Sequence, residues 1–221
     1  MTTIAIIGAG PGLGAAVARR FGREGFDVAV ISRAQEHADA LAAQLGGEGV
    51  TARGFAADVR DPKALTAALD AAAAALGTIE VLQYSPVPHR DFMKPILETT
   101  AADLVGPVEF SVYGPATAVG QVLPGMRELG RGTLLFVNGG SAVQPLPERA
   151  GTSIAFAAES VYAQLLHDTL ADAGIHAAQL IIPGAITPGD PHSDPEILAD
   201  TLWSLHHTRE GFRHFASPLT T

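Results

Sequence analysis

A glycine-rich segment near the start of the chain has the residue types and spacing needed to bind a phosphorylated ligand. It lies between the apolar run Ile4–Ile7 and the amphipathic stretch Gly12–Arg23, so it is predicted to join a strand to a helix. Glycines there let the backbone approach a pyrophosphate and direct the first N–H groups of the helix at its charge. Tight turns also use glycine, so the flanking elements carry the prediction of a dinucleotide site. The residues expected to contact the cofactor are Gly8, Gly10, Pro11, Gly12, Leu13 and Gly14.

The second predicted strand ends in Ser32 and Arg33, about twenty residues beyond the glycines. In dinucleotide sites an acidic residue at this place binds the ribose 2′-hydroxyl of NAD, whereas an arginine accepts the 2′-phosphate of NADP. Arg33 has no Asp or Glu beside it. The alternative is an ordinary exposed arginine. The sequence therefore favours NADP(H) over NAD(H) as cofactor.

Two later segments also follow predicted strands. A carboxylate after the third strand, at Asp58, can accept hydrogen bonds from the adenine amino group, or it could cap the next helix, for which Asp61 is better placed. The segment Pro183–Thr187 follows the sixth strand, although Pro-Gly pairs also simply end strands. The residues expected to contact the cofactor in these segments are Asp58, Val59, Pro183, Gly184, Ile186 and Thr187.

Four residues could act on a substrate. Tyr84 and His89 are predicted to lie on the loop after the fourth strand, at the sheet edge where α/β proteins bind ligands. They are the first candidates for proton transfer, and Tyr84 is also expected to contact the cofactor. Asn138 and Ser141, after the fifth strand, could donate hydrogen bonds to a substrate oxygen that gains charge. The alternative for Tyr84 and His89 is a surface or packing role.

Short β-branched runs alternate with longer Ala-rich amphipathic stretches, which predicts a doubly wound, Rossmann-like parallel α/β sheet of six or seven strands with helices on both faces. Strands are expected at Ile4–Ile7, Val28–Ile31, Thr51–Ala56, Val81–Tyr84, Leu134–Val137 and Ala177–Ile182, with a short seventh at Gly211–Ala216. Helices are expected at Gly12–Arg23, Gln35–Leu45, Pro62–Leu76, Pro107–Leu129, Ser153–Ala173 and Pro195–Thr208. No linker-like run divides the chain, so residues 1–221 are predicted to form one dinucleotide-binding domain.

Composition and charge argue against several classes of function. Hydrophobic residues make up 47% of the 221 residues, enough for a large core. The net charge of −9, without a cluster of Lys or Arg, disfavours nucleic acid and anionic membranes as partners. Cysteine is absent, and no histidines or carboxylates have the spacing of a metal site. No segment has the pattern of a signal peptide or a membrane span, so a cytoplasmic location is expected.

These motifs together resemble the short-chain dehydrogenase/reductase family over nearly the whole chain. The residues that carry the resemblance are Gly8, Gly12 and Gly14, the pair Asp58 and Val59, and Pro183–Thr187. The resemblance implies a nicotinamide cofactor, with the backbone of Ile186 holding the carboxamide and Thr187 beside it. It also implies a homodimer or homotetramer built on the long helices, and a substrate-covering loop at Pro188–Pro195.

The catalytic pattern of that family is missing from the matching positions. It is a Tyr made acidic by a Lys four residues later, with a Ser that polarises the substrate carbonyl and an Asn that holds a relay water. Alignment of the stretch Ser153–Gln164 places Ile154 and Ala158 at the Tyr and Lys positions. The other replacements are Asn138–Ser141 for the Ser-rich turn, Ser111 for the Asn, and Tyr84–Val87 for the Asn-Asn-Ala-Gly turn.

Two functions remain open. The first is an NADP(H)-dependent oxidoreductase with a non-standard active site, acting on an unidentified small molecule. The alternative is a catalytically inactive protein that responds to NADP(H) and regulates or binds a partner. We favour the enzyme because Ile186 and Thr187 concern the redox half of the site, which a regulator does not need.

Overall fold

A parallel sheet of seven strands forms the centre of the structure, a computed structural model that describes residues 2–219. The strands are β1 (Thr2–Ile7), β2 (Phe26–Ser32), β3 (Ala52–Ala56), β4 (Ile79–Tyr84), β5 (Gly132–Gly139), β6 (Ile175–Ile182) and β7 (Arg213–Phe215). They lie in the order β3-β2-β1-β4-β5-β6-β7, and every neighbouring pair is parallel. The predicted doubly wound α/β fold is therefore confirmed.

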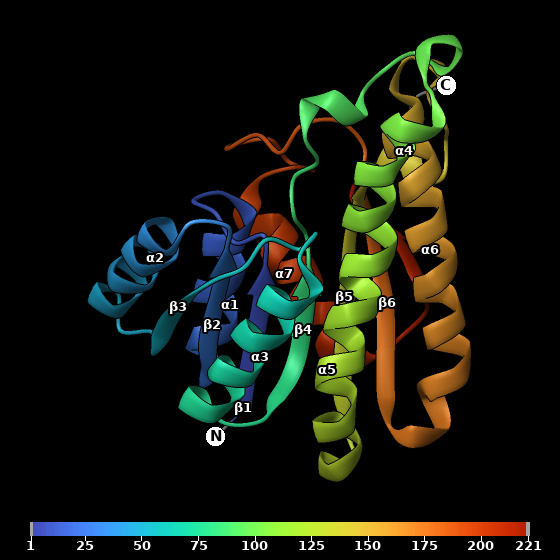
Figure 1. The fold of residues 1–221 in the computed structure, drawn as a ribbon. Helices are drawn as coiled ribbons and strands as arrows, with labels where there is room; N and C mark the ends of the chain where they lie inside the picture. The colour runs from blue at the N-terminus through green and yellow to red at the C-terminus, as the bar shows by residue number, and fades with distance from the viewer. Residues whose placement is uncertain (1, 220–221) are drawn as a thin grey trace.

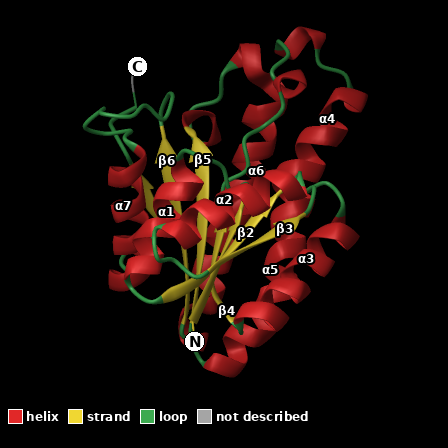
Figure 2. Cartoon of the chain, turned by 90° about the vertical axis from the view of Figure 1, so that its left-hand side faces the viewer, coloured by secondary structure: helices red, strands yellow, loops and turns green. Residues whose placement is uncertain are grey.

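Helices cover both faces of this sheet (Figures 1 and 2). The α-helices are α1 (Leu13–Arg23), α2 (Gln35–Gly47), α3 (Pro62–Leu76), α4 (Ala101–Val108), α5 (Gly114–Leu129), α6 (Ala150–Leu170) and α7 (Pro195–Thr208). Residues of α1, α2 and α7 share one buried core, and residues of α3, α5 and α6 share the other. None of the helices within residues 2–219 is long and apolar enough to cross a membrane.

The two cores arise from the alternation of side chains along the central strands. In β1, Ile4 and Ile6 face the core that contains α1, whereas Ala5 and Ile7 face the core that contains α3. All four are fully buried. A strand buried on both faces reads as a continuous apolar run, which is why the strands could be found in the sequence.

The direction of strand order reverses between β1 and β4, because β2 and β3 extend to one side and β5 to β7 to the other. The loops after β1 and β4 therefore diverge at the carboxyl edge of the sheet, where open α/β sheets bind their ligands. Backbone hydrogen bonds tie these loops to the sheet. The N–H groups of Gly8 and Ala9 donate to Ile31 O at 3.0 and 3.1 Å, and Ser85 N donates to Ile7 O at 3.0 Å.

The helix predicted at Pro107–Leu129 differs most from its prediction. It begins at Ala101, where Thr100 and Asp103 form a capping box, and a π-helical turn at Glu109–Tyr113 separates α4 from α5. Pro107 suggested a helix start because proline is favoured in the first turn, but here it lies inside α4. The π-helical turn is a local distortion of the kind often found at functional sites.

The remaining boundaries differ only slightly from those predicted. Helix α6 begins at Ala150 and ends at Leu170, with a 3₁₀ turn at Ala171–Ala173, whereas the prediction was Ser153–Ala173. The seventh strand is limited to Arg213–Phe215. Helix α7 and helix α3 have the predicted bounds, and Asp61 caps α3 by accepting hydrogen bonds from Lys63 N and Ala64 N.

Replacement of Gly8 by Ala is expected to destabilise the fold by about 2–4 kcal/mol. Gly8 has φ +83°, and an added Cβ would lie 2.3 Å from Pro86 Cα, a backbone atom that cannot move aside easily. Urea unfolding followed by circular dichroism measures the change. Gly10→Ala is the matched control, because its Cβ would meet no atom within 4 Å, and its stability should change by less than about 0.5 kcal/mol. Equal stability of the two variants would contradict this account.

Candidate functional site

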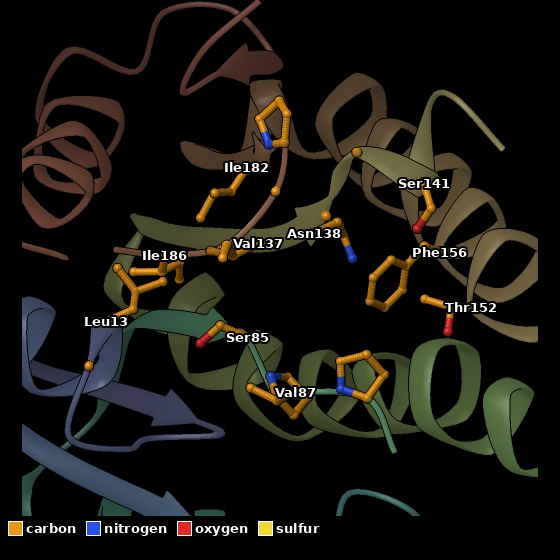
Figure 3. A pocket seen from close by; sticks show the side chains of 18 of the residues that line it. Leu13, Ser85, Val87, Val137, Asn138, Ser141, Thr152, Phe156, Ile182 and Ile186 are labelled. Atoms are coloured by element: carbon orange, nitrogen blue, oxygen red, sulfur yellow. The ribbon is translucent and has the colours of Figure 1, made fainter. Parts of the chain in front are cut away.

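A cavity of about 820 Å³ lies at the carboxyl edge of the sheet, at the point where the strand order reverses. Its walls come from the glycine-rich loop after β1, residues 85–88 after β4, residues 137–141 of β5 and the following turn, and residues 182–186 after β6. Figure 3 shows side chains from these segments facing one space. Its size is that of pockets that hold cofactors and small ligands.

The glycine-rich loop gives the cavity an open, positively polarised end. A Cβ added at Gly10 or Gly12 would meet no atom within 4 Å, so the backbone there is open to an approaching group. Gly12 is the N-cap of α1 and no side chain caps the helix. Ala15 N donates to Gly10 O at 2.9 Å, so the N–H groups of Leu13 and Gly14 are those left without a partner among the described residues. An anion such as a pyrophosphate fits this backbone. The predicted residues Gly8, Gly10, Pro11, Gly12, Leu13 and Gly14 all line the cavity.

The predicted adenine-side residues lie together beyond the glycine-rich loop. Ser32 pairs with Ala56 in the register of β2 and β3, so Arg33 and Asp58 both follow strand ends at the same edge. Arg33 is exposed and forms no hydrogen bond or ion pair with any residue of the described chain. The Asp58 carboxylate accepts a hydrogen bond from Arg60 N at 2.9 Å and leaves the helix cap to Asp61. These two side chains therefore lie outside the cavity, at its glycine end.

The segment after β6 forms the opposite wall. Pro183, Gly184 and Ile186 line the cavity, whereas Thr187 is exposed, is not among the lining residues, and donates its N–H to Ser193 O at 3.0 Å. The following loop is an ordered turn with its own hydrogen bonds. The lining residues at the two ends of this turn are Pro188 and Pro195.

Two carboxylates hold that turn. Asp190 accepts hydrogen bonds from His192 N at 2.9 Å and from Ser193 N at 2.8 Å. Asp194 accepts from Gly189 N at 2.6 Å and caps α7 by accepting from Glu196 N at 2.8 Å. Backbone hydrogen bonds lower the pKa of both carboxyl groups, because these bonds stabilise the carboxylate form. Within residues 2–219 no group of three or more His, Cys, Asp or Glu residues could hold a metal ion.

Tyr84 does not lie where the sequence predicted it. It is the last residue of β4 rather than part of the following loop, it is only 1% exposed, and it faces the core beneath α5. Its hydroxyl donates to the carbonyl oxygen of Phe110, and burial raises its pKa well above the usual value. The prediction that Tyr84 contacts cofactor and transfers a proton is not supported by this structure, because Tyr84 is the last residue of the strand and its phenol is buried in the core, away from the cavity.

His89 lies on the predicted loop but outside the cavity. Its side chain is exposed, and its Nδ1 lies 3.2 Å from a carboxylate oxygen of Asp91. The loop residues that do line the cavity are Ser85, Pro86, Val87 and Pro88. The predicted role of His89 beside a substrate is therefore not supported by its position.

Asn138 and Ser141, by contrast, both line the cavity as predicted. Asn138 is the last but one residue of β5 and is buried, and its side chain reaches into the space beside the Phe156 ring (Figure 3). Its Oδ1 accepts a hydrogen bond from Gln179 Nε2 at 2.8 Å. Because the oxygen is occupied, the NH₂ group of Asn138 is its remaining donor; one of its two N–H bonds is available to the neighbouring Glu159 carboxyl group and the other to a further group.

A hydrogen-bond network formed by residues of β6, β7 and α6 fixes the orientation of the Asn138 amide. Arg213 of β7 donates to Gln179 Oε1 at 3.0 Å and to Ser160 Oγ at 2.8 Å, and Ser160 Oγ donates to the same Gln179 oxygen at 2.8 Å. Arginine can only donate, so Gln179 must present its oxygen to Arg213 and its NH₂ group to Asn138. Sequence reasoning missed Gln179, Ser160 and Arg213. The only indication of this network in the sequence was the presence of two polar residues, Gln179 and Ser160, within apolar segments.

The positions assigned to the Tyr and Lys do not face the cavity. Ile154 and Ala158 are exposed on the outer face of α6, and Ile154 is 44% exposed. The residues of α6 four positions apart that line the cavity are Thr152 and Phe156. The helix sequence is nearly uniform in small residues, so it offers no anchor for the register.

Glu159 is a further residue that sequence reasoning missed. It is 1% exposed, and burial raises its pKa to about 8, while the nearby Asn138 and Ser111 act in the opposite direction. No hydrogen bond of ordinary geometry reaches its Oε1 from the described residues. The carboxyl group is therefore mainly protonated at neutral pH, beside a residue that lines the cavity.

Comparison with known proteins places this chain in a family. Residues 2–192 match the sequence model described as short chain dehydrogenase. D-threitol dehydrogenase of Mycolicibacterium smegmatis is 46% identical over 77 residues, 35% of this chain and 30% of that protein. A fatty acyl-CoA reductase of Mycobacterium tuberculosis is 26% identical over 188 residues, 84% of this chain and 63% of that protein. The chain thus spans less than two thirds of the length of either relative.

Solved structures agree over nearly the whole chain. A short-chain dehydrogenase from Rhodopseudomonas palustris has a TM-score of 0.86 and 26% identity, covering 99% of both chains. A metagenomic short-chain oxidoreductase in complex with NADP has a TM-score of 0.85 and 19% identity, covering 99% of this chain and 98% of that one. L-sorbose reductase from Gluconobacter frateurii, complexed with NADPH and L-sorbose, has a TM-score of 0.86 and 21% identity, covering 96% and 94%. Because the family model matches most of its residues, this chain belongs to the short chain dehydrogenase family.

Proposed function

We propose that this protein is an NADP(H)-dependent oxidoreductase that acts on a small molecule through proton-transfer residues other than the Ser-Tyr-Lys set of its family. The observation that carries this proposal is a single cavity with an anion-binding helix N-terminus at one end and buried hydrogen-bond donors at the other. When bound there, the cofactor supplies or accepts a hydride, and the protein supplies orientation and electrostatics.

The chain offers a contact for each charged or polar part of that cofactor. The backbone of Gly10 and Gly12, open to solvent, would receive the pyrophosphate. The Asp58 carboxylate would accept hydrogen bonds from the adenine amino group. By the family resemblance, the backbone of Ile186 would hold the nicotinamide carboxamide, with Thr187 at its side.

Arg33 is the reason to prefer NADP(H). Its guanidinium is exposed, has no partner among residues 2–219, and follows the strand next to the glycine-rich loop. The chain carries a net charge of −9, so a local cation is needed to attract a ligand with three phosphates. Two similar structures hold NADP or NADPH, which supports the same choice.

The substrate end of the cavity suits a carbonyl compound or the matching alcohol. The NH₂ group of Asn138 and the hydroxyl of Ser141 can both donate to an oxygen that gains charge as hydride is transferred. Apolar side chains of Val87, Met93 and Phe156 complete the wall. A small, partly apolar substrate fits this combination.

The proposal extends to a homo-oligomer. The outer face of α6 exposes three apolar side chains, Ile154, Val161 and Leu165. Val161 lies about two turns after Ile154, and Leu165 about one turn after Val161, so the three share one face. An apolar stripe of this kind is suited to a symmetric contact with a second copy of the helix.

NADPH should bind more tightly than NADH, and Arg33→Ala should weaken NADPH binding by roughly ten- to a hundredfold while leaving NADH binding unchanged. A charge-assisted contact to the 2′-phosphate is lost in the variant. Isothermal titration calorimetry measures both affinities. Arg53→Ala, on β3 and three residues before the end of that strand, is the matched control and should bind both nucleotides like the unaltered protein. Binding of neither nucleotide would refute the proposed function.

Asn138→Ala should lower kcat by about a hundredfold or more, because a hydrogen-bond donor to the substrate oxygen is removed. Affinity for NADPH should stay within about threefold. The rate is measured as NADPH oxidation with the best substrate from a panel of aldehydes and ketones. Gln164→Ala, which removes an amide bonded to Asp168 on the outer part of α6, is the control. NADPH binding without turnover of any panel member would favour a cofactor-responsive protein instead.

A further inference from the structure

Three buried polar atoms near the substrate end of the cavity have no hydrogen-bond partner among the described residues. They are Oγ of Ser111 in the π-helical turn, Oγ1 of Thr152 near the start of α6, and Oε1 of Glu159 two turns further along α6. Such atoms are rare in folded proteins, because burial of a polar atom without a hydrogen-bond partner destabilises the folded state. Thr152 lines the cavity, and Asn138, which also lines it, adjoins Glu159.

We propose that Glu159 stores the proton that the substrate oxygen receives during reduction. This inference rests on the proposed oxidoreductase function and names the proton source for it. Ser111 and Asn138 adjoin the Glu159 carboxyl group, and Asn138 and Thr152 line the cavity, so these are the polar groups available between Glu159 and the substrate. Glu159 acts through these groups and not by contact with the substrate.

The charge balance of the reaction favours a neutral acid at this place. The carbonyl carbon of the substrate gains a hydride from the reduced nicotinamide, and its oxygen gains the proton of Glu159. The products are an alcohol, an oxidised nicotinamide with one positive charge, and a Glu159 carboxylate. The opposite charges appear together, so no net charge is created inside the protein. Glu159 then regains a proton from solvent.

A purely structural role explains Glu159 less well. Buried carboxylates are almost always paired with a cation, as Glu80 is with Arg131 at 3.0 Å. Glu159 has no ion pair among residues 2–219. The nearest cation of the network, Arg213, is already bonded to Gln179 and Ser160. A lone carboxyl kept neutral by burial is a typical arrangement for a group that donates a proton.

Few titratable groups face Glu159. Tyr84 faces it from β4, and Glu159 together with Asp58 raises the pKa of that phenol, after the larger effect of burial. From the π-helical turn and from β5 it meets only the neutral side chains of Ser111 and Asn138. No charged side chain of the described residues contributes to the shift of its own pKa. Its ionisation should therefore respond mainly to charge brought into the cavity.

The first test measures protons released when nucleotides bind. NADP⁺ brings a positive nicotinamide and should release more protons at pH 7 than NADPH does, with a difference of up to about one proton per site. Titration of the 2′-phosphate is common to both nucleotides and cancels in this difference. Calorimetry of the full chain in two buffers of different ionisation enthalpy gives both proton counts.

Variants assign that difference to its residue. Glu159→Gln should abolish it while both nucleotides still bind, and Glu80→Gln, a buried carboxyl paired elsewhere, should retain it. Glu159→Leu, of similar volume, should give the same loss as Glu159→Gln if the amide variant folds poorly. An equal difference in unaltered protein and Glu159→Gln, or no difference at all, would overturn the role of Glu159 and leave cofactor binding intact. Failure of both nucleotides to bind would overturn the proposed function and this inference together.

Thermal unfolding provides a second test that needs no ligand. Folding raises the pKa of Glu159 from 4.5 to about 8, so the folded state loses stability relative to the unfolded chain as the pH rises between these values. The Tm of Glu159→Gln minus that of the unaltered protein should therefore increase from pH 5 to pH 8 and level off above it. A difference independent of pH would show that the carboxyl is not stored in its neutral form.

Discussion

The close approach of Gly8 to Pro86 is the constraint on which the geometry of the site depends. Gly8 ends β1 at φ +83°, and its Cα lies so near the chain after β4 that no side chain could fit between them. The same loop is anchored to β2 through Ile31 O. The loop after β1, the loop after β4 and the end of β2 are thus held close together by backbone contacts. The open glycines, the exposed Arg33 and the wall at residues 85–88 all take their positions from it.

A buried hydrogen-bond network positions the side chains at the other end of the cavity. Arg213, on the edge strand β7, orients Gln179, and Gln179 in turn orients Asn138 at the cavity wall. Fully bonded polar networks of this kind fix one arrangement of side chains in an otherwise apolar core. Glu159 lies beside Asn138, the last member of the network, and its Oε1 has no hydrogen-bond partner of ordinary geometry among the described residues.

The sequence allowed most of the fold and one half of the site to be predicted. Buried parallel strands are continuous apolar runs, and the glycine-rich loop has a fixed place between strand and helix, so β1, α1 and the cavity wall between them could be predicted. The other half depends on register, which local pattern does not determine. Tyr84 was expected on a loop but is the last residue of β4, with its side chain on the core face, and Ile154 and Ala158 lie on the exposed face of α6. Glu159 could be recognised only once its burial was known.

The central claim is that the cavity at the carboxyl edge is an NADP(H) site. A crystal structure of the protein grown with NADPH would test it most directly. Our account predicts the pyrophosphate over Gly10 and Gly12 at the start of α1, the 2′-phosphate beside Arg33, and the nicotinamide between Asn138 and Ile186. Density for the nucleotide elsewhere on the molecule, or none in crystals grown at saturating NADPH, would contradict it.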